Sequence, residues 1–158
     1  MGVGLAERRR GALTPDERLG APGRGDRLSS YLGLRWEDAG TIRLTAGPEL
    51  LNHGGMLLGP VGFALVDYGM GTALWDQTTT DEGIATTNIA LNFVAAATAG
   101  ELVCRSTVDH RSRRAASLRS EVYQGKRLVI TAIGTFAVFP LDVYPTHRGN
   151  DQAYQTDG

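Results

Sequence analysis

The span from Gly54 to Trp75 contains a single charged residue, Asp67. Gly59 followed by Pro60 indicates the start of a helix, because a proline in the first turn gives up no hydrogen bond that the helix needs. The sequence therefore predicts one helix from this point to about Trp75. Because apolar side chains occupy all of its faces, we expect the helix to be buried nearly all round, as when a curved sheet wraps it.

Asp67 is unusual in such a helix, because its neighbours three and four positions away are all uncharged: Phe63, Ala64, Met70 and Gly71. A buried carboxylate must find hydrogen-bond donors or become neutral. Sequences seldom keep one in such a place without a purpose. On this evidence alone, Asp67 is either a catalytic carboxylate or a structural one that bonds to neighbouring backbone or lies at a subunit boundary.

The same stretch, Met56–Trp75, has the length of about 20 apolar residues that spans a bilayer. It also contains Asp67, Pro60 and several glycines. The segments after it have the pattern of strands rather than of further membrane spans. We therefore interpret it as a buried helix and predict no membrane partner.

Composition narrows the class of protein. A chain of 158 residues with 42% hydrophobic and 21% charged residues fits one domain with an ordinary core. The net charge of -1 argues against nucleic acid as a partner. No metal cluster, P-loop or dinucleotide fingerprint occurs in the sequence, so no cofactor is predicted. The single cysteine, Cys104, and the absence of an apolar run after Arg8–Arg10 favour a reducing, cytoplasmic setting.

Three parts are expected along the chain. Residues 1–28 are rich in Gly, Pro, Arg and Asp and predict a flexible N-terminal arm, residues 29–142 form the domain, and residues 143–158 form a flexible C-terminal tail. Before the helix, Tyr31–Trp36 and Thr41–Thr45 are predicted to be the strands of a hairpin. Four further strands are predicted after the helix as an antiparallel meander: Thr86–Val94, Glu101–Asp109, Ala116–Tyr123 and Arg127–Phe139.

The order of these elements resembles the hotdog fold, an α+β architecture in which an antiparallel sheet wraps around one long central helix. The segment 52–67 resembles the acyl-CoA thioesterases of the phenylacetyl-CoA and 4-hydroxybenzoyl-CoA branch, the PaaI-like thioesterases. Their pattern is approximately N-x-x-G-x-x-H-G-G with a later acidic residue, and the matching positions are Asn52, Gly55, Gly59 and Asp67. Thr86–Phe93 resembles the T-x-x-x-x-x-N-F segment of the same family, and the whole resemblance covers residues 31–140.

The resemblance implies hydrolysis of an acyl-CoA thioester to the free acid and CoA. It implies that Asp67 acts as general base or as nucleophile, and that the backbone N–H of Gly59 polarises the thioester carbonyl. A helix N-terminus suits that role, because it presents unpaired N–H groups and a partial positive charge. By the same resemblance Asn52 orients the water or the carboxylate across a subunit boundary, and Thr86 or Thr87 holds the water.

The chain departs from the family pattern next to the catalytic glycine. Leu58 stands where the family has histidine, and Pro60 replaces its second glycine. His53 lies five residues earlier and either compensates from the loop or is an exposed loop histidine. The spacing of His53 and Asp67 also resembles that of hotdog β-hydroxyacyl-thioester dehydratases, so dehydration stays open as an alternative. A noncatalytic hotdog module that binds acyl-CoA is the other alternative, because a fold alone does not fix an activity.

The remaining expectations concern ligands and assembly. Arg111, Arg113 and Arg114 form a basic turn, which either contacts the CoA phosphates, as related thioesterases do, or is solvated. An apolar acyl site is expected from these residues, which are also core candidates: Met56, Leu57, Leu58, Phe63, Met70 and Leu74. The resemblance implies a homodimer or a homotetramer, which would also cover a sheet edge.

Overall fold

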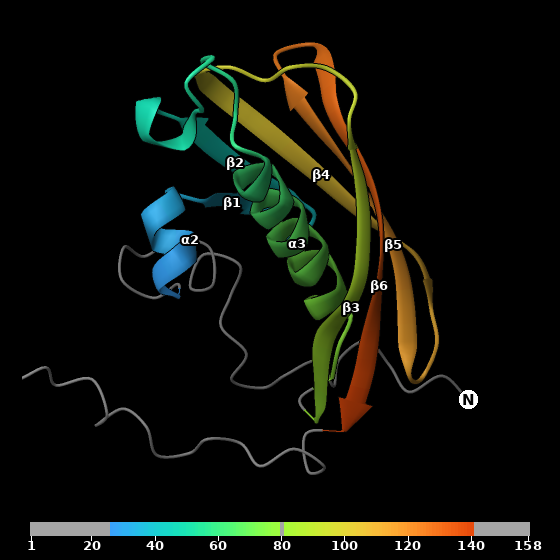
Figure 1. Ribbon diagram of the computed structural model, residues 1–158. Helices are drawn as coiled ribbons and strands as arrows, with labels where there is room; N and C mark the ends of the chain where they lie inside the picture. Colours follow the sequence, from blue (N-terminus) through green and yellow to red (C-terminus); the bar gives the residue numbers. More distant parts are fainter. Residues whose placement is uncertain (1–25, 80, 141–158) are drawn as a thin grey trace, which may run out of the picture.

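The computed structural model describes residues 26–79 and 81–140, and Figure 1 shows their arrangement. A single long helix lies against the inner face of one curved antiparallel sheet. The expected flexible arm over residues 1–25 and the expected tail over residues 143–158 lie outside the described residues. The predicted hotdog architecture is confirmed.

The described elements follow one another along the chain in an order close to the predicted one. They are α2 (Arg27–Leu32), β1 (Arg35–Asp38), β2 (Thr41–Ala46), the short 3-10 helix η2 (Pro48–Leu50), α3 (Gly59–Trp75), β3 (Glu82–Phe93), β4 (Gly100–Arg111), β5 (Ala115–Gln124) and β6 (Arg127–Pro140). The predicted boundaries of α3 are confirmed at both ends. Among the described residues no helix has the length and apolar character needed to cross a membrane.

The sheet has the strand order β1-β2-β4-β5-β6-β3. The prediction of a four-strand meander is therefore wrong for its first strand: β4, β5 and β6 follow one another, but β3 pairs with β6 and not with β4. The alternation of side chains in β3 fits either neighbour, so only the tertiary fold decides the pairing. In the described sheet, β3 forms one edge and the much shorter β1 forms the other.

The first predicted strand, Tyr31–Trp36, is also wrong over its first four residues. Asp26 caps a helix there, since its carboxylate accepts hydrogen bonds from the N–H groups of Leu28 and Ser29. Gly33 ends the helix in the left-handed conformation (φ 65°), which glycine adopts without strain. The strand begins only at Arg35. Of the residues that the composition assigned to the arm, Asp26 thus caps α2, and residues 27 and 28 belong to it.

Helix α3 is buried on the side that faces the sheet. Val66, Met70 and Leu74 are fully buried there. At Gly69 the helix comes so close to β4 that an added Cβ would lie 2.6 Å from Ser106 Oγ. The prediction that α3 is buried all round is wrong for the single chain, because 42% of Phe63 is exposed. The sheet curves behind the helix and does not close around it (Figure 1).

Candidate active site

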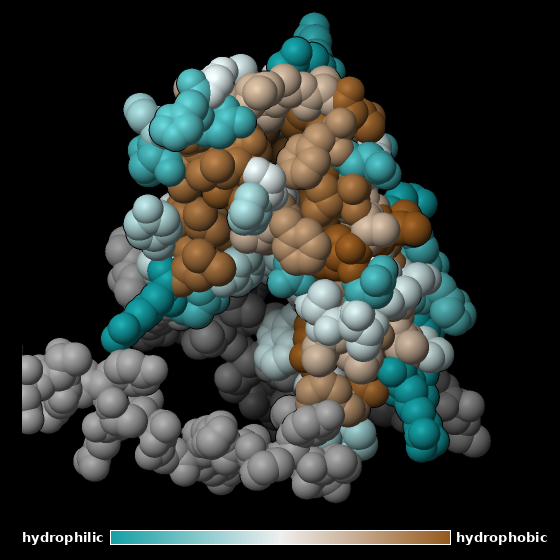
Figure 2. All heavy atoms as spheres, viewed as in Figure 1, coloured by the Kyte–Doolittle hydropathy of each residue, from teal (hydrophilic) through white to brown (hydrophobic). Residues whose placement is uncertain are grey.

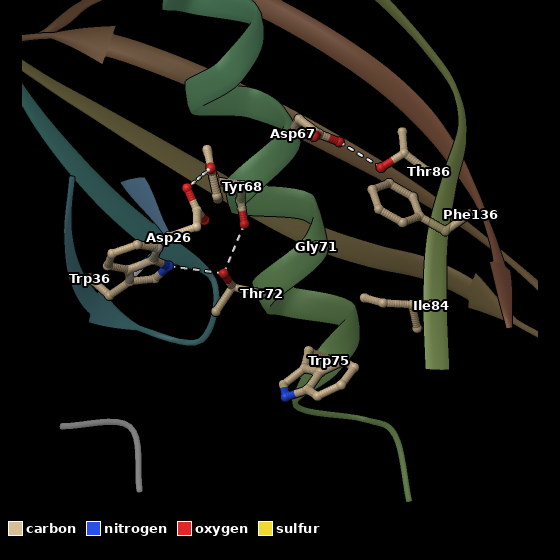
Figure 3. Close-up of a pocket in the computed structure, with 10 residues that line it drawn as sticks. All are labelled: Asp26, Trp36, Asp67, Tyr68, Gly71, Thr72, Trp75, Ile84, Thr86 and Phe136. Atoms are coloured by element: carbon tan, nitrogen blue, oxygen red, sulfur yellow. Dashed lines mark hydrogen bonds between the residues drawn. The ribbon is translucent and has the colours of Figure 1, made fainter. Parts of the chain in front are cut away.

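A pocket of about 470 Å³ opens beside Asp67. Helix α3 supplies its floor, β3 and β6 supply one wall, and α2 and β1 supply the other (Figure 3). The residues that line it are mostly aromatic or small: Asp26, Trp36, Asp67, Tyr68, Gly71, Thr72, Trp75, Ile84, Thr86 and Phe136. An apolar concavity with a few convergent polar groups is the usual form of a small-molecule site.

Asp67 is half-buried and reaches toward β3, where the hydroxyl of Thr86 donates a hydrogen bond to its Oδ1 at 2.7 Å. Its other oxygen, Oδ2, accepts no hydrogen bond from the described residues. Thr87 points elsewhere, because its hydroxyl donates to the carbonyl oxygen of Thr135 on β6 at 2.8 Å. The sheet register shifts between Thr86 and Asn88, and such a bulge re-aims side chains. Of the two predicted threonines, the structure therefore brings only Thr86 to Asp67.

Tyr68 and Asp26 form a second polar pair in the pocket wall. The Tyr68 hydroxyl donates to Asp26 Oδ1 at 2.6 Å and so ties α2 to α3. Burial, together with this bond to a carboxylate, raises the pKa of Tyr68 to about 12. Burial alone would raise the pKa of Asp26, but the hydrogen bonds from Tyr68, Ser29 and Leu28 together lower it. The wall therefore carries a charged carboxylate at neutral pH.

This pair leads to a prediction about stability and pH. Asparagine caps a helix as well as aspartate does, so Asp26→Asn keeps the acceptor and removes only the charge. Because the folded pKa of Asp26 lies below the ordinary value of 3.8, the charge stabilises the folded state above that pH, and the benefit is lost as the pH falls through the folded pKa. We expect the natural protein to be more stable than the variant near neutral pH and the difference to vanish in acid. Urea unfolding of both proteins at several pH values measures this, and a difference that does not change with pH would contradict it.

Trp36 completes the wall on the side of β1. Its indole N–H donates to the hydroxyl of Thr72 at 2.9 Å, and Thr72 in turn donates to the backbone oxygen of Tyr68 at 2.8 Å. The rings of Trp36 and Tyr68 meet edge to face, with centroids 6.3 Å apart. Because the polar atoms of this wall bond to one another, its aromatic surfaces are held in place beside the pocket.

The start of α3 carries an unpaired backbone donor. The N–H groups of Val61 and Gly62 both donate to the Leu58 carbonyl oxygen, and Pro60 has no N–H. The N–H of Gly59 donates to no residue in the described chain. Within the first turn, which the structure describes in full, Gly59 is thus the one free donor, and it lies at the positive end of the helix dipole. The predicted oxyanion donor is therefore available.

Asn52 lies in the turn that leads into α3. Its Oδ1 accepts hydrogen bonds from the N–H groups of Gly54 (2.8 Å) and Met56 (3.1 Å), and this shapes the loop. Its amide nitrogen, Nδ2, bonds to no described residue, so it can reach an acceptor outside the chain. His53 is exposed in the same turn and forms no hydrogen bond or ion pair with Asp67 in the described structure. Leu58 is the N-cap of α3 and offers no side-chain donor.

The predicted site residues do not all meet within one chain. Gly59 and Asp67 lie eight residues apart on the same helix, which separates them by about 12 Å along its axis. A reacting thioester carbonyl is far smaller than this gap. Within one chain, Gly59 and Asp67 therefore do not reach the same carbonyl group.

The three arginines at the basic turn between β4 and β5 differ in their contacts. Arg111 pairs with Glu82 on β3, so its guanidinium is already engaged within the chain. Arg113 and Arg114 are exposed and line a second pocket, of about 640 Å³, together with Glu82 and Phe139. Of the three predicted phosphate contacts, the structure leaves Arg113 and Arg114 accessible to a ligand.

The predicted apolar lining of the acyl site is partly wrong. Met70 and Leu74 point into the core and have no accessible surface, so they line neither the pocket nor the outer surface. Sequence reasoning missed the aromatic residues Trp36, Trp75 and Phe136. Trp75 shares a helix face with Asp67 at a spacing of eight residues, which is a signal that could have found it.

Neither a metal-binding cluster nor a reactive cysteine is found in the described chain. No cluster of three or more His, Cys, Asp or Glu side chains that could hold a metal occurs among residues 26–79 and 81–140. Cys104 is fully buried under α3, and this burial raises the pKa of its thiol to about 11. A thiol in such surroundings is a poor nucleophile.

Comparison with known proteins agrees with this fold. The family model described as the thioesterase superfamily matches residues 54–131, which include both Gly59 and Asp67. The structure of a conserved protein from Pseudomonas aeruginosa is 32% identical in sequence, with a TM-score of 0.68, and the match covers 73% of this chain and 95% of that one. This chain belongs to the thioesterase superfamily. The resemblance to PaaI-like thioesterases predicted from the sequence is confirmed, and the protein is an enzyme of the thioesterase type.

Two further solved structures share the fold of this thioesterase. A phenylacetic acid degradation-related protein from Ralstonia eutropha is 26% identical, with a TM-score of 0.65, and the match covers 73% of this chain and 93% of that one. A Bacillus halodurans protein solved with CoA shares the fold at 20% identity and a TM-score of 0.69, with 73% of this chain and 77% of that one covered. No curated protein sequence matches the chain.

Proposed function

We propose that this thioesterase hydrolyses an acyl-CoA thioester to the free acid and CoA, with Asp67 as the general base or the nucleophile. The observation that carries the proposal is the hydrogen bonding of the Asp67 carboxylate in its pocket. Thr86 fixes one oxygen, and the other oxygen accepts no hydrogen bond from the described residues. A half-buried carboxylate held in this way can take a proton from water or attack a carbonyl carbon.

Gly59 supplies the second part of the mechanism. As water or Asp67 attacks, the carbonyl oxygen of the thioester gains negative charge, and the free N–H of Gly59 at the start of α3 stabilises it. The carbon–sulfur bond then breaks, and CoA leaves as its thiolate, which takes up a proton. If water attacks, Asp67 accepts its proton and the free acid forms directly; if Asp67 attacks, water hydrolyses the resulting anhydride, which releases the acid and restores the carboxylate. Asn52, through its free amide N–H groups, holds the attacking water or the Asp67 carboxylate.

Two copies of the chain are needed to assemble this site. Beside the start of α3 lies an apolar surface formed by Leu58, Phe63, Phe93 and Val94, each of which exposes at least 36% of its area. Figure 2 shows apolar side chains gathered on this face of the molecule. The long strand β3 runs next to it and bonds only to β6 in the described sheet. An open strand edge beside exposed apolar residues is a typical surface for pairing, so we propose a dimer through β3.

CoA is the proposed leaving group for two reasons. Arg113 and Arg114 are exposed at the turn between β4 and β5, where their charges can meet phosphate groups. The related Bacillus halodurans protein was solved with CoA. We propose that these two arginines contact the CoA phosphates, while Arg111 remains paired with Glu82.

The proposal predicts the outcome of a substrate panel. We expect the purified protein to release free thiol from at least one class among aryl, short-chain and long-chain acyl-CoA esters, followed with a thiol reagent. The same protein is also incubated with β-hydroxyacyl-CoA esters, and the absorbance of an enoyl product is measured. Enoyl formation would favour the dehydratase that His53 and Asp67 suggest. Binding of the esters without thiol release would favour the noncatalytic module.

A further inference from the structure

The floor of the pocket has a gap in its middle. Asp67, Gly71 and Trp75 follow one another at successive turns of α3 and so lie on one face of the helix (Figure 3). From Asp67 to Trp75 this face is about 12 Å long. Gly71 leaves bare backbone at its centre, between the wall that carries Trp36 and the wall that carries Phe136.

Packing explains the other two glycines in the interior of α3 but not Gly71. A Cβ at Gly62 would lie 2.8 Å from Ile130 Cδ1, and a Cβ at Gly69 would lie 2.6 Å from Ser106 Oγ, so both positions exclude a side chain. At Gly71 the nearest heavy atom would be Phe136 Cε1, at an ordinary contact distance of 4.0 Å.

The backbone does not require glycine at this position either. The glycines with positive φ in the described chain are others, and Gly71 has the conformation of the helix that contains it. Glycine in the interior of a helix is less stable than alanine, because it loses more conformational freedom on folding. Gly71 therefore lowers the stability of α3, and neither packing nor backbone conformation in the described fold accounts for it.

We propose that Gly71 is a specificity-determining residue: the space left by its missing side chain holds the acyl group of the substrate beside Asp67. This inference rests on the proposed thioesterase function. The rings of Trp36, Trp75 and Phe136 lie around the space, so the substrate class is a broad apolar acyl group, one with a ring or a branch. An acetyl group would leave most of the space empty.

A small side chain at this position should therefore lower the activity toward large acyl groups and raise the stability of the protein. Gly71→Ala places one methyl group in the space, and Gly71→Val fills more of it. One methylene group in an apolar pocket changes the discrimination between substrates by about tenfold or more. We expect kcat/KM for phenylacetyl-CoA to fall by about tenfold in Gly71→Ala and further in Gly71→Val, while kcat/KM for acetyl-CoA changes little. The melting temperature of Gly71→Ala should rise.

Gly69→Ala is the matched control, because it adds the same methyl group two residues away on the face that meets the sheet. Its Cβ would collide with Ser106, so the melting temperature should fall while the ratio of phenylacetyl-CoA to acetyl-CoA turnover stays that of the natural protein. The inference is overturned if the Gly71 variants keep the natural ratio, or if the natural protein prefers acetyl-CoA to every larger ester. A natural protein that releases no thiol from any ester would instead reject the proposed function itself.

Discussion

Asp67→Asn is expected to lower kcat for acyl-CoA hydrolysis by about 10²–10⁴-fold, the usual contribution of a positioned acid or base. Asparagine has the same shape, and its side-chain oxygen still accepts the hydrogen bond that Thr86 donates. The variant therefore loses the basic and nucleophilic oxygen and little else. Steady-state kinetics on the best ester of the panel measures the loss, and circular dichroism and thermal unfolding check that the fold is kept.

The matched control is Asp76→Asn, which makes the same chemical change at the other end of the same helix. Asp76 is the C-cap of α3, is exposed, and does not line the pocket beside Asp67. Its replacement should leave kcat close to the natural value. If Asp67→Asn keeps natural kcat, Asp67 is the structural carboxylate that the sequence left open, and the proposed mechanism is wrong.

The strongest local signals in the sequence were sufficient to predict the centre of the fold. A long run with one charge that begins with Gly59-Pro60 predicts a helix, and α3 has the predicted bounds. Asp67 was recognisable because a single charge in such a run needs a donor, and Thr86 is that donor. These features depend on residues that are close in sequence or on one strong pattern.

Features that depend on distant residues could not be predicted in the same way. The place of β3 beside β6 is set by the tertiary fold, because its side-chain pattern fits several neighbours. The choice between Thr86 and Thr87 depends on a register shift that the sequence does not reveal. Helix α2 was missed because its cap, Asp26, follows a segment with the composition of a flexible arm. The aromatic walls join residues from β1, α3 and β6, which only the folded chain brings together.

Two inactive variants are expected to restore activity when they pair with each other. Asp67→Asn removes the carboxylate, and Asn52→Asp removes the free amide donor but keeps the side-chain oxygen that shapes the loop. If each site takes Asn52 from one chain and Asp67 from the other, a mixed dimer has one site with both defects and one with neither. We expect the mixed dimer to recover about half of the natural activity, while each variant alone stays nearly inactive.

The measurement uses two different affinity tags, so that co-expressed mixed dimers are purified away from both parent dimers before their kinetics are measured. A mixed dimer of the natural chain with Asp67→Asn is the control, and it should also show about half of the natural activity, whichever chain supplies Asn52. The decisive comparison is between the two mixed dimers. If both residues acted within one chain, the dimer of two different variants would have a defect in each site and would stay inactive, although the control dimer was active. Since about 12 Å of helix separates Gly59 from Asp67 within a chain, we expect the two mixed dimers to be equally active.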